Sequence, residues 1–196
     1  RFDADAMERM RQQFLVSAQQ RNDDPNDLAA DAVRQLAYGT HPYGRSVKGT
    51  AETISAITAD DLRAYHKAAF TREGLKIAVV GDIGPEELGQ ALDHIFGGLP
   101  DAARPAAPAE VQVSEGPAVR VIERDIPQSI IMFMARGIKR DDPEFFPAFV
   151  MSHMLGGGDF GTRLTTEVRE KRGLTYGISY GLQTLKSSGS YIGSFS

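Results

Sequence analysis

The sequence predicts an α+β fold, and three observations support that prediction. Apolar residues recur at helical spacing in several segments, and short apolar runs that end in glycine or charged residues are typical of strands. A stretch rich in proline and alanine, residues 100–117, separates the two halves and predicts an extended, semi-rigid linker. A chain of 196 residues, 41% of them hydrophobic, accommodates one large domain or two small ones.

The half before the linker is predicted to be mostly helical. A helix is expected over residues 5–21, where methionines and Phe14 recur at helical spacing, and another from Leu28 to Leu36 after the turn Asp23-Asp24-Pro25-Asn26. Thr58 is a candidate N-cap, with acidic residues in the turn that follows. We also expect a strand at Leu75–Val80 and a helix from Pro85 to about Phe96.

The half after the linker mixes strands and helices. Strands are predicted at residues 118–122 and 129–135, and helices at about 143–155 and 160–172. A β-hairpin is predicted from strands at 175–185 and 190–195, joined by the turn Lys186-Ser187-Ser188-Gly189.

Composition and charge exclude several classes of protein. The net charge is −4 and no basic stripe stands out, so we expect no nucleic-acid partner. No apolar run approaches the roughly 18 residues that span a bilayer, so no membrane span is expected. The absence of cysteine excludes disulfides, thiolate zinc sites and thiol nucleophiles. Both ends look like cuts through a longer protein.

The four histidines do not have the spacing of a metal site. His41, His66, His94 and His153 are far apart, so no His-x-x-Glu-His or His-Glu-x-x-His pattern places two imidazoles on one helix face. We therefore expect no metal site in this chain. His41, which precedes a proline in a tight loop, is predicted to be a structural hydrogen-bonding residue.

A glycine run follows the helix predicted at 143–155. Gly156, Gly158 and Gly161 match the letters of a G-x-G-x-x-G dinucleotide motif, but that motif must follow a strand and open a helix, with an acidic residue about 20 positions later. Neither condition holds here. The simpler interpretation is a helix cap and hinge. A sharper one is a loop that gates substrate, formed by Gly156, Gly157 and Gly158, since glycine lets a peptide approach the backbone closely.

The most informative segment runs from Arg163 to Tyr176. Helix-end physics explains much of it, because its last turn is cationic and Gly173 is placed to end the helix. It does not explain why a long cation at Arg169 stands near an aromatic hydroxyl at Tyr176. Arginine can hold a carboxylate and a tyrosyl hydroxyl can donate to an oxyanion, so the pair is a candidate peptide-binding site.

This segment resembles the pitrilysin/insulinase family of zinc peptidases, especially its bacterial branch similar to the mitochondrial processing peptidase. The branch has a helix that reads like Arg-Leu-(x)2–3-Glu-Val-Arg-Glu-Lys-Arg-Gly-Leu-x-Tyr after a glycine-rich loop, and the match runs from Gly156 to Tyr176. Family motifs also occur in the expected order earlier in the chain: Asp23-Asp24-Pro25, His41-Pro42-Tyr43-Gly44, Val79-Val80-Gly81-Asp82 and Phe96-Gly97-Gly98-Leu99-Pro100.

The resemblance implies a role for each half of the chain. The fold would consist of two family-type units, each an antiparallel-rich sheet covered by helices and each truncated here. Residues 1–99 would be the C-terminal part of the first unit, residues 100–117 the linker, and residues 118–196 the N-terminal part of the second. Arg169 and Tyr176 fall on the family's substrate-binding pair.

One departure from the family bears on catalysis. The third zinc ligand of active members is a glutamate shortly before the Asp-Asp-Pro turn, and alignment on that turn places Ser17 there. Serine does not replace a carboxylate on Zn²⁺ at ordinary affinity. The resemblance then implies that this chain has no catalytic residue and holds no cofactor, and that zinc is bound by a partner.

The resemblance thus implies the non-catalytic, substrate-binding subunit of a zinc metalloendopeptidase that acts on extended peptides. Its expected partners are a zinc-bearing homologous subunit, in a heterodimer, and a peptide substrate. Two alternatives stay open: an active peptidase whose His-x-x-Glu-His motif lies upstream, and a structural scaffold without a peptidase role. The family suggests a periplasmic location for a bacterial protein, with the cytoplasm as the alternative.

Overall fold

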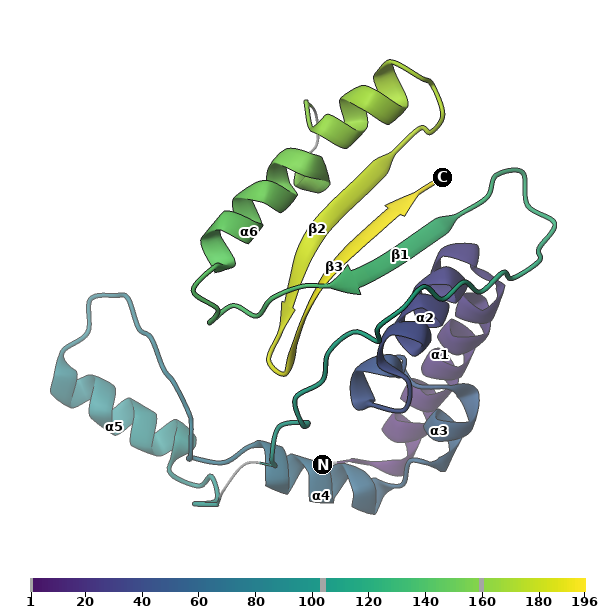
Figure 1. Cartoon of the computed structure of the whole chain (residues 1–196). Helices are drawn as coiled ribbons and strands as arrows, with labels where there is room; N and C mark the ends of the chain where they lie inside the picture. Colours follow the sequence, from purple (N-terminus) through teal and green to yellow (C-terminus); the bar gives the residue numbers. More distant parts are fainter. Residues whose placement is uncertain (1, 103–104, 159–160) are drawn as a thin grey trace. The chain divides into compact units, whose positions relative to one another are not determined.

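A computed structural model describes residues 2–102, 105–158 and 161–196, and the α+β class is confirmed (Figure 1). The α-helices are α1 Ala4–Asp23, α2 Pro25–Tyr38, α3 Ala51–Ala56, α4 Ala59–Ala69, α5 Pro85–Phe96 and α6 Phe145–Ser152. A 3₁₀ turn, η1, spans Pro42–Gly44, and two π-helical turns are η2 His153–Gly157 and η3 Thr165–Glu170. The strands are β1 Ile131–Arg136, β2 Ile178–Leu185 and β3 Ser188–Phe195.

The contacts divide the chain into two units. The first contains Arg1–Gln13 and Glu52–Ala106, and the second contains Phe14–Ala51 and Ala107–Ser196. Within this chain the later part of the proline-rich segment therefore groups with the second unit. How the intact protein divides into domains, with a linker at 100–117, stays a prediction.

The helix starts follow local capping chemistry, as the sequence predicts. The side chain of Asp24 accepts hydrogen bonds from the backbone nitrogens of Asn26 (2.8 Å) and Asp27 (3.1 Å) and caps α2, with Pro25 in the first turn. In the first unit, Thr58 and Asp61 form a reciprocal capping box at the start of α4. α5 begins at Pro85 and ends at Phe96, as expected.

The sheet lies in the second unit and has the strand order β1-β3-β2, with both neighbouring pairs antiparallel. The predicted hairpin is confirmed as β2 and β3, with a tighter turn than expected because Leu185 already pairs with Ser188. β1 confirms the strand expected at 129–135, shifted slightly toward the C-terminus. On one face, the ring of Phe133 lies over Gly193, its partner across the sheet, and stacks against the ring of Tyr180 with ring centres 6.1 Å apart.

Two predicted strands do not form among the described residues. Residues 75–80 and 118–122 are irregular, and most of their apolar side chains are exposed, fully so at Val80 and 88% at Val119. A strand pattern in the sequence shows only how apolar and polar side chains are spaced along the chain. A strand in the structure also needs a neighbouring strand with which its backbone can form hydrogen bonds. Neither segment has such a neighbour in the described residues.

A small core forms beside the sheet. Ala37 and Tyr38 from α2 and Val113 from the proline-rich segment are buried together, with Tyr43 and Met134 packed against them. The backbone nitrogen of Ser114 donates to the carbonyl oxygen of Ala37 at 2.9 Å. This part of the predicted linker is therefore bonded to α2, although most of its residues are exposed as expected.

His41 is the structural hydrogen-bonding residue that the sequence predicts. Its Nδ1 accepts from the backbone nitrogen of Tyr43 (3.2 Å), and its Nε2 lies 3.1 Å from the carbonyl oxygen of Ala109. The hydroxyl of Tyr43 accepts from the backbone nitrogen of Ser187, in the β2–β3 turn, at 3.1 Å. The His-Pro-Tyr-Gly motif thus joins α2, the proline-rich segment and the hairpin turn within the second unit.

Candidate peptide-binding site

Arg169 lies on the helix that ends just before the sheet. This helix covers residues 163–170 and closes with wider turns: the backbone nitrogen of Lys171 bonds to the carbonyl of Thr166, and that of Leu174 to the carbonyl of Val168. Gly173 has φ +61°, the left-handed conformation expected of a glycine that ends a helix. The helix start predicted near residue 160 lies outside the described residues.

The turn after Gly173 brings Tyr176 back to Arg169. The guanidinium carbon of Arg169 lies 5.1 Å from the centre of the Tyr176 ring, within the range of a cation–π contact. Tyr176 is 80% exposed and Arg169 is half-buried, so the tyrosine ring is accessible to a ligand. Tyr176 precedes β2 rather than starting it, since β2 begins at Ile178.

Thr175 holds the turn that presents Tyr176. Its side chain is nearly buried, and its hydroxyl accepts from the backbone nitrogen of Gly177 (3.2 Å). The same hydroxyl lies within donating distance of two carbonyl oxygens, those of Gly177 (2.7 Å) and Ser196. The backbone nitrogen of Tyr176 also donates to Ser196, at 3.3 Å. The ring of Tyr176 therefore projects from a backbone that is fixed to the end of β3.

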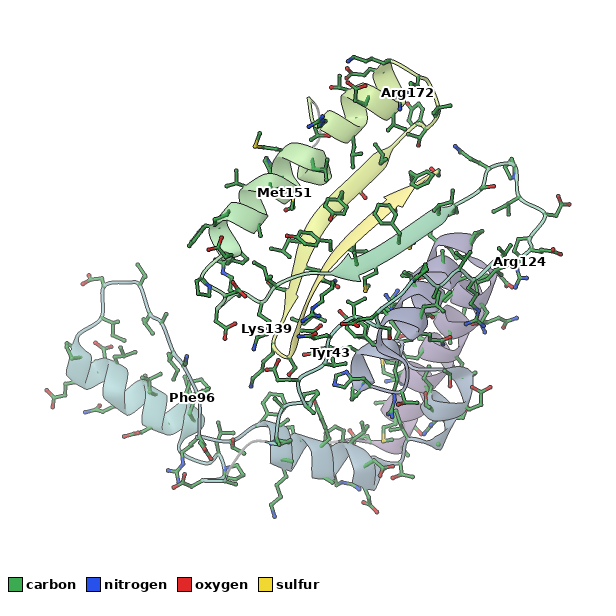
Figure 2. All side chains as sticks on the ribbon, viewed as in Figure 1. Tyr43, Phe96, Arg124, Lys139, Met151 and Arg172 are labelled. Carbon is green, nitrogen blue, oxygen red and sulfur yellow. The ribbon has the colours of Figure 1, made fainter. Side chains whose placement is uncertain are left out.

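The surroundings of the pair are cationic. The Nζ of Lys171 lies 2.6 Å from Oε1 of Glu167. This hydrogen bond and the positive charge of Lys171 hold the pKa of Glu167 below its usual value. The charges of Arg172 and Arg163 lower the pKa of Glu167 further. Figure 2 shows the side chains of this helix end around the labelled Arg172. The segment from Gly161 to Tyr176 contains four basic residues and only two acidic ones, Glu167 and Glu170. Such a surface favours an anionic group of a ligand.

The glycine run is not the open loop that the sequence suggested. Gly156 and Gly157 complete η2, and only Gly158 lies beyond it. A Cβ on Gly156 would come within 2.9 Å of the Cβ of Tyr180, and one on Gly157 within 3.4 Å of the Tyr180 carbonyl oxygen. Gly156 therefore allows the helix to pack closely on β2. A gating role for Gly156, Gly157 and Gly158 stays a prediction.

The residues that the structure describes do not fit a zinc site. Among the described residues, no group of three or more His, Asp or Glu side chains is placed to hold a metal ion. Ser17, at the position that resembles the third ligand of active peptidases, is a half-buried residue of α1. His153 stacks on the ring of Phe149, with ring centres 6.3 Å apart.

The sequence pointed to Arg169, Tyr176 and Gly173, and the structure brings Arg169 and Tyr176 into contact. It did not point to Thr175. The signal that points to Thr175 is its position between the glycine stop and the tyrosine, but its partner at Ser196 is remote in sequence. No helix in the described part of the chain is long and apolar enough to cross a membrane.

Comparison with known proteins extends these observations. The family profile described as "Peptidase M16 inactive domain" matches residues 56–195. An uncharacterized zinc protease of Mycobacterium leprae is 32% identical over 94% of this chain and 42% of its own length. A probable mitochondrial-processing peptidase subunit beta of Schizosaccharomyces pombe is 29% identical over 80% of this chain and 35% of its own length.

A solved structure agrees with the family match. The crystal structure of a peptidase M16 inactive domain from Pseudomonas fluorescens is 33% identical, with a TM-score of 0.90 over 99% of this chain and 47% of that chain. The chain thus spans less than half the length of these relatives. On its motifs, its family profile and its fold, the chain belongs to the M16 family of zinc peptidases, the pitrilysin/insulinase family, and matches the family's inactive domain.

Proposed function

We propose that the protein containing this chain is the non-catalytic, substrate-binding subunit of a zinc metalloendopeptidase that acts on extended peptides. The observation that carries the proposal is the contact between the half-buried Arg169 and the exposed Tyr176, on a surface with excess positive charge. A guanidinium and a phenolic hydroxyl together can hold a peptide carbonyl or carboxylate and donate to an oxyanion as it forms.

The division of labour follows from what this chain offers. The described residues present donors for a peptide and no cluster of metal ligands. The proposal places zinc on a homologous partner subunit, in a heterodimer, and includes the periplasmic location implied by the family resemblance. A relative named as a subunit of a processing peptidase supports an assembly of this kind.

The test uses the full-length protein together with its zinc-bearing homologue. Arg169→Ala and Tyr176→Phe are each expected to lower turnover of an extended fluorogenic peptide by about 10- to 1,000-fold, the range for loss of a transition-state hydrogen bond. Tyr176→Phe should leave the melting temperature nearly unchanged, because substitutions of exposed residues usually cost less than about 0.5 kcal/mol. Arg63→Ala, an exposed arginine of α4 in the first unit, is the matched control.

The alternatives give different results. Turnover by the full-length protein without a partner, abolished by a chelator, would favour an active peptidase with its own upstream motif. Unchanged turnover in both variants would leave the scaffold role.

A further inference from the structure

Two exposed arginines stand at the two ends of the helix that carries Arg169. Arg163 is the first residue of this helix, and Arg172 lies just beyond its last turn, where Figure 2 labels it. Both side chains are exposed, and neither forms an ion pair or hydrogen bond with any residue that the structure describes. Both guanidinium groups are therefore accessible to a ligand.

The helix itself explains the cations at its end but not the one at its start. The negative end of the helix dipole stabilises Lys171 and Arg172, whereas the positive end disfavours a cation at Arg163. The carboxylate one turn on from Arg163, that of Glu167, already accepts a hydrogen bond from Lys171 at 2.6 Å. Helix stability therefore gives no reason for an arginine at position 163.

The three cations act on the same part of the surface. The hydrogen bond from Lys171 has the largest effect on the pKa of Glu167 and lowers it, and the charges of Arg172 and Arg163 lower it as well. All three cations thus lie close enough to stabilise one carboxylate. Glu167 is half-buried at the surface, so a carboxylate of a ligand that approaches this helix face would meet the same positive field.

The strands that continue from this surface contribute no opposing carboxylate. Residues 171–196, which include β2 and β3, contain no Asp or Glu. The chain as a whole has a net charge of −4, whereas the segment from Gly161 to Tyr176 has four basic residues and two acidic ones. Positive charge is therefore concentrated beside the Arg169–Tyr176 pair, against the trend of the chain.

We propose that this surface selects acidic peptides, with Arg163 and Arg172 attracting the Asp and Glu side chains of a substrate that the Arg169–Tyr176 pair holds. The inference rests on the proposed function and adds a class of substrate to it. Attraction between exposed charges acts mainly on the rate of association. Acidic side chains in the substrate should therefore raise kcat/KM and change kcat little.

Three fluorogenic peptides that differ only in carrying Glu, Gln or Lys at the same three positions test this preference. With the full-length protein and its zinc-bearing homologue at low salt, kcat/KM for the Glu peptide should exceed that for the Gln peptide by about fivefold or more. The ratio should approach one at high salt, because the Debye length falls from about 30 Å at 0.01 M to about 3 Å at 1 M. A ratio near one at low salt, or a preference for the Lys peptide, would overturn the proposal.

The double variant Arg163→Gln/Arg172→Gln tests the two arginines. It should reduce the Glu-to-Gln ratio at low salt to less than about twofold. Arg45→Gln/Lys48→Gln is the matched control and should keep the ratio, because it removes the same charge from exposed positions beside η1. The η1 residue Tyr43 bonds to the β2–β3 turn, at the opposite end of the hairpin from Tyr176. An equal loss in both double variants would attribute the preference to net charge and refute the inference.

Binding measured without turnover separates this inference from the proposed function. Fluorescence anisotropy with the full-length protein alone should give a lower Kd for a labelled Glu peptide than for its Gln counterpart, and Arg163→Gln/Arg172→Gln should remove the difference. If turnover depends on Arg169 and Tyr176 but the two Kd values are equal, the proposed function stands and acidic selectivity is refuted. If the Kd difference depends on the two arginines while Arg169→Ala and Tyr176→Phe keep full turnover, the proposed function fails, and with it a selectivity that acts through the pair.

Discussion

The helix that ends at η2 meets strand β2 at Gly156, where an added Cβ would lie 2.9 Å from the Cβ of Tyr180. The backbone nitrogen of Tyr180 would be 3.1 Å away and a methyl of Leu164 3.0 Å away. The nearest atoms belong to the body of the sheet and to a packed side chain, so the added methyl has little room. Gly156 is thus required by packing, whatever its part in substrate gating.

We predict that Gly156→Ala destabilises the protein by about 1–3 kcal/mol, the usual cost of overpacking. Gly181→Ala on β2 is the matched control, because a Cβ at Gly181 meets nothing within 4 Å. Urea unfolding of the two variants measures the difference. Equal midpoints would show that η2 does not pack on β2 as described.

Thr175 should act through the position of Tyr176. Thr175→Val leaves the backbone nitrogen of Gly177 without its acceptor, which should lower the free energy of unfolding by about 1–3 kcal/mol. Thr175→Ser keeps the hydroxyl and should restore most of that loss. In the reconstituted peptidase, the valine variant should also reduce kcat/KM for an extended peptide, and the serine variant should recover it. Loss of stability with unchanged kcat/KM per folded protein would limit Thr175 to a structural role.

Acid should weaken the cap of α2. Hydrogen bonds from the backbone nitrogens of Asp27 and Asn26 hold the pKa of Asp24 below its ordinary value of 3.8. A carboxyl with a lowered pKa in the folded state stabilises the protein above its unfolded pKa, and this stabilisation is lost as pH falls through the folded pKa. Asp24→Ala should therefore reduce the melting temperature more at pH 7 than at pH 2.5. Asp24→Asn retains an acceptor without a titrating charge and should reduce that pH dependence; a constant difference for Asp24→Ala would contradict the cap.

Metal analysis of the purified chain tests the absence of ligands. After mild chelation and return of zinc, we expect no stoichiometric binding, because no His pair has ligand spacing and Ser17 stands where the glutamate is expected. Tightly held zinc that is lost on mutation of His41 or His153 would refute this expectation.

The features that could be predicted from the sequence are local ones. The caps at Asp24 and Thr58 and the left-handed Gly173 depend on neighbours within a few residues. The closeness of Arg169 to Tyr176 follows from the same helix end. Their functional role stays a prediction, because contact between two side chains does not identify a ligand.

The features that could not be predicted depend on distant partners. The strand patterns at 75–80 and 118–122 are present in the sequence, yet pairing depends on where another strand lies in space. The role of Thr175 depends on Ser196, and that of Gly156 on Tyr180. Spacing in the sequence contains no information about these contacts.

The hydrogen bond between Tyr43 and Ser187 joins residues 144 positions apart, and that between Tyr38 and Ser188 joins residues 150 apart. During synthesis on the ribosome, α2 therefore emerges long before the turn that completes its surroundings. Until that turn arrives, the two tyrosines lack these partners, and closing so long a loop costs conformational entropy. The second unit should consequently fold late and slowly, and a chaperone that protects nascent α2 should raise the yield of native protein.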